Sequence, residues 1–189
     1  MTTPINDPDK QASVSAADRK YVFHSWSAQG AIAPMPIASG SGSRFWDHAG
    51  KVYLDFSSQL VFTNIGHQHP KVIKAIQEQA EVLTTIAPQH ANDARNEAAQ
   101  RIVELAGSDF AKVFFTNAGA DAIENAIRMA RMHTHKHKIL STYRSYHGNT
   151  GAAINATGDP RRFPNEFAFG HVHFWGPYLY RTAFWASSQ

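Results

Sequence analysis

The spacing of apolar positions along the chain changes near residue 70. From Pro70 onward, apolar residues recur every three or four positions, which predicts an amphipathic helix with proline in its first turn. The apolar positions of this stretch are Val72, Ile73, Ile76, Ala80 and Leu83. A second helix is expected from Asp93 to Ala106, with Asn92 as N-cap and Gly107 as C-cap. The same period predicts a third helix from Ala120 to about Met132.

Short runs rich in β-branched and aromatic residues lie around the third helix. They are KVFFT (112–116), KILST (138–142) and HVHFW (171–175). A strand, a helix and a strand at this spacing form a βαβ unit, in which the strands are parallel and helices pack on the sheet. The chain is therefore expected to contain an α/β domain.

The first third of the chain lacks the helical period. Residues 1–20 are polar and predict a flexible tail, and an irregular segment rich in Pro, Gly and aromatic residues follows. The runs 43–47 and 51–56 flank HAG, which predicts a β-hairpin. With a boundary near 66–70, we expect a tail (1–20), an N-terminal segment with a hairpin (21–68) and an α/β domain (69–189).

Composition narrows the possible classes of protein. The chain has 189 residues, 43% of them apolar, a formal charge of +3 and no cysteine, which excludes disulfides and thiolate chemistry. No run of about 18 apolar residues predicts a membrane span, and no apolar signal segment opens the sequence. The basic residues are scattered, so we expect no nucleic-acid partner. These features predict a cytoplasmic protein that does not bind membranes.

The histidines His133, His135 and His137 alternate after the third helix, and His171 and His173 alternate on a predicted strand. A metal site needs converging ligands with second-shell support. No carboxylate or cysteine stands at a matching spacing, so no metal is expected.

The turn TNAGAD (116–121) joins a predicted strand to a predicted helix through small residues. The first amides of a helix lack intrahelical acceptors and lie at its positive end, so a turn without bulky side chains favours a phosphate. SYHGNTGAA (145–153) follows the next strand and should meet this turn at the carboxyl edge of the sheet. Tyr146 would add an aromatic face beside the anion site.

Three stretches in this order resemble landmarks of the class III aminotransferases, which include the omega-transaminases. They are GHQHPKVIKAI (66–76), FFTNAGADAIENAIRMAR (114–131) and YRSYHGNTGAA (143–153). The resemblance covers about residues 20–189. It implies the N-terminal part of the fold type I transferase fold, with an incomplete large domain, and pyridoxal 5'-phosphate (PLP) as cofactor.

The resemblance also implies cofactor-binding residues. Ala118, Gly119 and Ala120 match the phosphate-binding turn, where the family usually has serines. The missing hydroxyl would weaken phosphate binding by about 1 kcal/mol. Glu124 matches an acidic residue near the cofactor pocket, although an exposed helix carboxylate is the simpler interpretation. Tyr146 matches the aromatic residue that stacks on the pyridine ring, followed by His147 and Gly148.

Similar enzymes line their substrate pocket at positions that match Trp26, Leu60 and Phe62, where plain packing is the alternative. The stretch TTIAPQHAN (84–92) matches a segment near the dimer interface, which implies a homodimer. Arg162 could meet a carboxylate or lie on the surface.

Transamination needs a lysine that forms a Schiff base with the cofactor and an acidic residue that holds the pyridine nitrogen. In the family both follow later than Gln189. None of the eight lysines matches, and they are 10, 20, 51, 71, 74, 112, 136 and 138. We therefore expect the N-terminal portion of an enzyme that moves an amino group between an amine or amino acid and a keto acid, inactive by itself. A non-catalytic PLP-binding or dimerising domain, or an aminomutase, are the alternatives.

Overall fold

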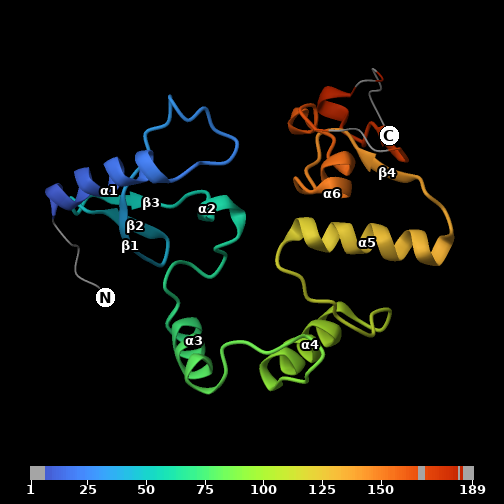
Figure 1. Ribbon diagram of the computed structural model, residues 1–189, viewed down its shortest axis with the longest axis horizontal. Helices are drawn as coiled ribbons and strands as arrows, with labels where there is room; N and C mark the ends of the chain where they lie inside the picture. The colour runs from blue at the N-terminus through green and yellow to red at the C-terminus, as the bar shows by residue number, and fades with distance from the viewer. Residues whose placement is uncertain (1–6, 166–168, 183, 185–189) are drawn as a thin grey trace. The chain divides into compact units, whose positions relative to one another are not determined.

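The computed structural model describes residues 7–165, 169–182 and 184 (Figure 1). The chain divides into two compact units, which we call unit 1 (Met1–His90) and unit 2 (Ala91–Gln189). Each unit is described by itself. The sequence-based domain boundary at 68–69 stays a prediction for the complete fold.

Unit 1 begins with a helix where we expected a flexible tail. Helix α1 spans Pro8–Tyr21, and the Asp7 carboxylate caps it by accepting a hydrogen bond from the Lys10 amide at 2.9 Å. Proline at the first helical position and Arg19 and Lys20 in the last turn favour the helix ends. The expectation of a tail was wrong for residues 8–20 because α1 has no apolar stripe by which to recognise it; none of its residues is buried.

A three-stranded antiparallel sheet follows, in the order β1-β2-β3. The hairpin is confirmed: β2 (Arg44–Asp47) pairs with β3 (Val52–Leu54). Strand β1 (Ile37–Ser41) pairs with β2 in a stretch that we expected to be irregular. That expectation was wrong for residues 37–41 because strand pairing with β2 satisfies the backbone of a segment whose own residues, IASGS, carry little apolar period.

Two helices complete unit 1. The short helix α2 covers Ser58–Val61, and Gln59 inside it has a positive φ of 61°. Helix α3 spans Pro70–Val82 with proline at its start, as the apolar spacing predicts. No residue of α3 is buried in the chain.

Unit 2 opens with two helices that confirm the predictions. Helix α4 spans Asp93–Ala106, and the Asn92 side chain accepts a hydrogen bond from the Arg95 amide at 3.1 Å, with Gly107 as C-cap. Helix α5 spans Gly119–Thr134, one residue earlier and two later than expected. His135 ends it in the left-handed conformation.

The parallel arrangement is confirmed for two strands. Strand β4 (Ile139–Thr142) pairs in parallel with β5 (His171–Phe174). The expected strand at 112–116 was wrong: this segment has no strand pairing in the part of the chain that the structure describes. A strand is stable only when a neighbour satisfies its backbone groups, and Phe114 here is 66% exposed.

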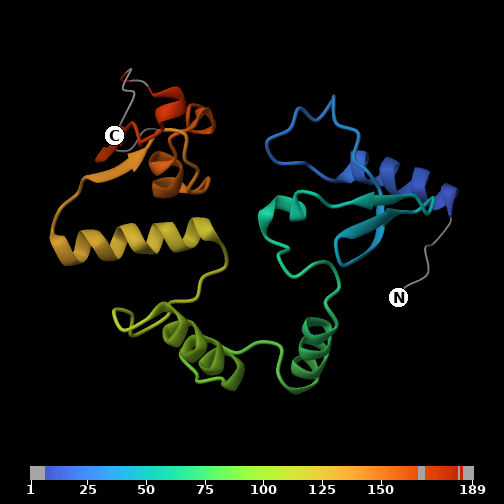
Figure 2. The same cartoon turned by 180° about the vertical axis from the view of Figure 1, so that it is seen from behind.

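Short elements place the core of unit 2. Helix α6 (Gly151–Ala156) contacts α5, both parallel strands and the 3-10 turn η1 (Pro160–Arg162), and a second such turn, η2, covers Leu179–Arg181. In both ribbon views α6 lies beside the N-terminal end of α5 (Figures 1 and 2). The buried apolar side chains among the described residues are Ile127, Ala153, Ile154 and Ala156. The core therefore lies where α6 meets α5 and the sheet.

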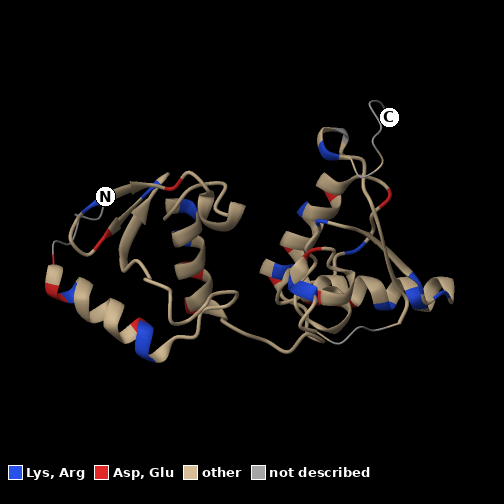
Figure 3. Ribbon diagram, turned by 90° about the horizontal axis from the view of Figure 1, so that it is seen from above, with Lys and Arg blue, Asp and Glu red and all other residues tan. Residues whose placement is uncertain are grey.

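Charged residues are distributed over both units, and Figure 3 shows basic and acidic positions interspersed along the helices. Among the residues that the structure describes, no helix combines the length and apolar character that crossing a membrane requires.

Candidate functional site

The N-terminus of α5 is open to ligands. Ala118 is the N-cap residue in extended conformation, and the first intrahelical bond runs from the Ala122 amide to the Ala118 carbonyl oxygen at 3.0 Å. The amides of Gly119 and Ala120 come before it and have no intrahelical acceptor. Gly119 is exposed, and nothing lies within 4 Å of the point where a Cβ would stand. An anion can therefore approach these amides closely.

The loop after β4 is seated directly on this helix end. Gly148 is buried with φ at +130°, and a Cβ there would lie 2.6 Å from the Cβ of Ala120. Only glycine combines this conformation with this approach. The contact brings Tyr146 and His147, two residues and one residue before Gly148, to the same end of α5, as the sequence predicts for the two motifs.

Thr157, which has no exposed surface, anchors the loop through hydrogen bonds. Its hydroxyl accepts a hydrogen bond from the His147 amide at 3.0 Å, and it lies 3.0 Å from the Ala153 carbonyl oxygen and 3.3 Å from that of Gly148. The Gly158 amide donates to the Ser145 carbonyl at 2.9 Å. These bonds fix the backbone that carries Tyr146 and His147.

Glu124 points toward the start of α6. Its Oε1 accepts hydrogen bonds from the Thr150 hydroxyl at 2.6 Å and from the amides of Ala152 and Ala153 at 2.7 and 3.0 Å. Burial alone would raise the pKa of Glu124, but the Thr150 hydroxyl, the two amides and the charge of Arg128 outweigh it and lower the pKa. The carboxylate thus joins α5 to the start of α6, so Glu124 is not a simple exposed helix residue. These bonds do not direct it toward a ligand.

Tyr146 is covered on one face by an arginine. The Arg161 guanidinium carbon lies 3.8 Å from the centroid of the Tyr146 ring, and the Tyr146 side chain remains 42% exposed. Asp159 binds Arg161 through both carboxylate oxygens. The hydrogen bond from Arg161 holds the pKa of Asp159 below its ordinary value, and the same bond raises the pKa of Arg161.

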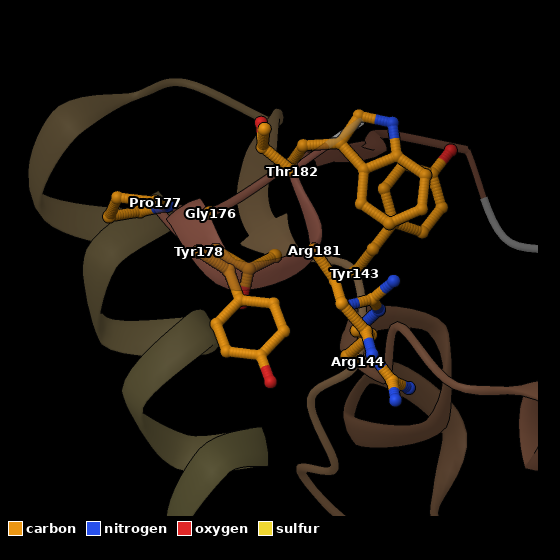
Figure 4. A pocket seen from close by; sticks show the side chains of 9 residues that line it. Tyr143, Arg144, Gly176, Pro177, Tyr178, Arg181 and Thr182 are labelled. Atoms are coloured by element: carbon orange, nitrogen blue, oxygen red, sulfur yellow. The ribbon is translucent and has the colours of Figure 1, made fainter. Parts of the chain in front are cut away.

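A cavity of about 600 Å³ lies where β4 and β5 end. Figure 4 shows Tyr143, Arg144, Tyr178 and Arg181 among the side chains that line it. None of the predicted cofactor-binding residues lines this cavity. The helix end is thus not part of this cavity.

The predicted substrate-pocket residues belong to unit 1. Trp26 (52% exposed), Leu60 (84%) and Phe62 (66%) lie on its surface. Because the cofactor-binding candidates lie in unit 2, the role of these three residues stays a prediction.

Unit 1 also contains a cavity of about 540 Å³ lined by Asp55 and His67, whose Oδ2 and Nε2 atoms are 2.7 Å apart. The Gln59 amide, followed by His67, lowers the pKa of Asp55 against the effect of burial. The sequence analysis quoted His67 only as part of a motif and missed this pair, because its partners are 12 residues apart.

The sequence analysis also missed Thr150, Thr157, Asp159 and Arg161. The stretch GDPRR (158–162) was the available signal, and it drew attention to Arg162 instead. Arg162 is half-buried, with Nη1 3.3 Å from the His173 Nδ1 atom. Arg161, the neighbouring residue, forms an ion pair with the carboxylate of Asp159.

The lysines of unit 2 are Lys112, Lys136 and Lys138. Lys136 and Lys138 follow the C-terminus of α5, a helix of 16 residues and therefore about 24 Å long. Lys112 precedes the extended segment that leads to Ala118. Among the described residues, no group of three or more His, Asp or Glu side chains is arranged to hold a metal ion.

Comparison with known proteins identifies the family. The model of the family aminotransferase class-III matches residues 26–175. The acetylornithine aminotransferase of Caldanaerobacter subterraneus is 35% identical over 76% of this chain and 37% of its own length. The chain belongs to the class III aminotransferases, a family of PLP-dependent enzymes.

Solved structures of similar proteins agree with this assignment. A taurine:2-oxoglutarate aminotransferase from Bifidobacterium kashiwanohense, in complex with PLP and glutamate, is 46% identical with a TM-score of 0.87, covering 90% of this chain and 39% of that chain. An (S)-enantioselective omega-transaminase from Thermomicrobium roseum is 31% identical with a TM-score of 0.85, covering 90% and 41%. The chain thus spans about two-fifths of the length of these relatives, and its α/β fold aligns with their N-terminal portion.

Proposed function

We propose that this chain supplies the phosphate-binding and ring-stacking part of a PLP-dependent aminotransferase. The whole enzyme would move an amino group between an amine or amino acid and a keto acid. When bound, PLP supplies the electron sink that this chemistry needs. The observation that carries the proposal is the seating of the 145–150 loop on the N-terminus of α5 through Gly148 and Ala120.

In this proposal each residue has a separate task. The amides of Gly119 and Ala120 donate hydrogen bonds to the cofactor phosphate, with Ala118 as the small N-cap that leaves room. The ring of Tyr146 covers one face of the pyridine ring, and Gly148 and His147 fix its backbone. Glu124 acts indirectly, because its Oε1 already accepts three hydrogen bonds from the loop and α6.

The residues present fit the cofactor. Exposed, positively polarised amides match a phosphate dianion, and a partly exposed aromatic ring nearby matches a planar heterocycle. The relative from Bifidobacterium kashiwanohense that was solved with PLP supports the same cofactor here. The relatives named above differ in amino donor, so the donor and the keto acid stay unassigned. We also propose that the whole enzyme is a homodimer, with residues 84–92 near the interface.

Catalysis needs a lysine that forms a Schiff base with the cofactor, and we propose that none of the eight lysines of this chain serves as that lysine. We therefore propose that the chain binds PLP without covalent attachment and has no aminotransferase activity by itself. Borohydride reduction after incubation with PLP should attach PLP to no single lysine in preference to the others. Transfer of an amino group from an amine donor to a keto acid by the purified chain would contradict this proposal.

A substitution at Gly119 tests the binding role directly. Gly119→Pro removes the amide donor but suits the first position of a helix, and the extended Ala118 before it tolerates proline. Gly119→Ala keeps the amide and places its Cβ in open space. We expect Gly119→Pro to raise the Kd for PLP about tenfold or more, the loss of one hydrogen bond to a charged group, and Gly119→Ala to change it little. Equal PLP binding by both variants, or no binding by the unchanged chain, would refute the proposed site.

A further inference from the structure

Arg161, which stacks on Tyr146, is held in place by both carboxylate oxygens of Asp159. Its Nε lies 3.1 and 3.0 Å from the two carboxylate oxygens of Asp159, and its Nη2 lies 2.5 Å from Oδ2. The Asp159 Oδ1 also accepts the backbone amide of Arg161 at 2.9 Å, which caps η1. The guanidinium plane is therefore fixed by a carboxylate that the backbone also fixes.

The segment that carries this pair is attached to the Tyr146 loop. The Gly158 amide donates a hydrogen bond to the Ser145 carbonyl oxygen at 2.9 Å. Ser145 directly precedes Tyr146, and Gly158 directly precedes Asp159. A Cβ on Gly158 would lie 2.1 Å from the Thr142 carbonyl oxygen, so this close approach requires glycine. The arginine and the tyrosine thus lie on two backbone segments that a hydrogen bond joins, with the guanidinium carbon 3.8 Å from the ring centroid.

We propose that Arg161, fixed by Asp159, is a positioning residue that holds the Tyr146 ring so that its opposite face can cover the pyridine ring of the cofactor. This proposal rests on the proposed function and adds to it a residue that determines the orientation of the stacking ring. A partly exposed tyrosine rotates about two side-chain torsions, and ordering it on binding costs affinity. A guanidinium stacked on one face removes that cost in advance.

A positioning role of Arg161 predicts different effects on the binding of PLP and of inorganic phosphate, whereas a purely structural role predicts the same effect on both. Inorganic phosphate uses only the amides at the start of α5, whereas PLP uses these amides and the Tyr146 ring. Loss of the Arg161 contact should therefore weaken binding of PLP and leave binding of phosphate unchanged. General loosening of unit 2 would weaken both.

The chain offers a matched control in the pair formed by Arg101 and Glu97 on α4. Its Nη2 and Oε1 atoms are also 2.5 Å apart, both side chains are exposed, and no aromatic contact of Arg101 is found among the described residues. Arg101→Gln therefore removes an arginine–carboxylate pair without touching Tyr146.

The experiment titrates the 189-residue chain with PLP and, separately, with inorganic phosphate, following the Gly119 amide resonance by NMR. We expect Arg161→Gln to raise the Kd for PLP about fivefold, the magnitude of one exposed cation–π contact, with no change in the Kd for phosphate. Arg161→Lys keeps the charge but loses the planar stack, so its Kd for PLP should lie between those of the unchanged chain and Arg161→Gln. The Kd of Arg101→Gln should equal that of the unchanged chain. The side-chain protons of Arg161 should also lose their ring-current shift in Tyr146→Leu.

The outcomes separate the two proposals. If the unchanged chain binds PLP and Arg161→Gln binds it equally well, the positioning role is wrong and the proposed function stands. If Arg161→Gln weakens phosphate as much as PLP, Arg161 only supports the fold. If the unchanged chain binds neither compound, the proposed function fails and the positioning role fails with it.

Discussion

Single residues decide whether the Tyr146 loop can rest on α5. Gly148 combines a positive φ with a contact that admits no side chain, and Thr157 satisfies the backbone beneath it. Neither requirement is visible in the spacing of apolar residues, and the sequence identified Gly148 only through a family motif. The physical reason for the glycine is the 2.6 Å approach to Ala120, which depends on the folded loop.

Gly148→Ala should therefore destabilise unit 2 by about 2 kcal/mol or more, through backbone strain and overpacking. Urea unfolding followed by circular dichroism measures the change. Gly151→Ala is the control, because Gly151 has no atom within 4 Å of its Cβ position and begins helix α6. Equal stability of the two variants would contradict the role given to Gly148.

Glu124 makes the stability of unit 2 depend on pH. Because its pKa in the folded chain is lowered, its contribution is fully present above about pH 4.3, the ordinary value for glutamate, and is lost as the pH falls through the folded-state pKa. Glu124→Gln should lose about 1 kcal/mol at pH 7, the usual value of a helix cap, and should show a weaker loss of stability on acidification. Glu97→Gln, in an exposed pair, should change neither quantity.

At the scale of elements, the sequence predicted those helix ends that are fixed by residues close together in the chain. The caps Asn92 and Gly107 and the proline at residue 70 act within a few residues, so the bounds of α4 and the start of α3 could be predicted from the sequence. Helix α1 lacks an apolar stripe and was missed. The bond from Glu124 to the start of α6 joins residues 26 to 29 apart, and no spacing rule predicts it. The motifs TNAGAD and SYHGNTGAA lie together as predicted, although the strand expected at 112–116 does not form in the described part of the chain.

The segment 112–116 shows the limit of local signals. Its composition favours a strand, but a strand also needs a partner. We expect the amides of residues 113–115 to exchange with solvent rapidly, while those of Leu140 and Ser141 in β4 exchange more slowly because β4 pairs with β5. Hydrogen exchange with mass spectrometry or NMR measures this difference. Similar protection of both segments would show that 112–116 is paired after all.

At the scale of the whole molecule, apolar side chains of several helices remain exposed to solvent. Helices α3 and α4 contain no buried residue although both have apolar faces, and Ile76 and Leu105 are 64% and 88% exposed. Uncovered apolar faces on amphipathic helices mark surfaces where protein packs against protein. The solved relatives, which are longer than this chain, are consistent with such packing.

Leu105→Gln should therefore reduce self-association of the purified chain and leave its free energy of unfolding within about 0.5 kcal/mol. Sedimentation velocity measures the first quantity and urea unfolding the second. Ile127→Ala, at a buried position, should instead cost about 2 to 4 kcal/mol and leave association unrelieved. A large loss of stability in Leu105→Gln would mean that α4 is already packed within the chain.

The seating of the loop on α5 has a consequence for biosynthesis. The approach of Gly148 to Ala120 and the hydrogen bonds of Thr157 and Gly158 to the loop lie between residues 120 and 158. Chains are made from the N-terminus, and compact units fold as they emerge. Once residue 174 has left the ribosome, the loop, α5, Arg161 and both parallel strands are available, so they can assemble before later residues are made.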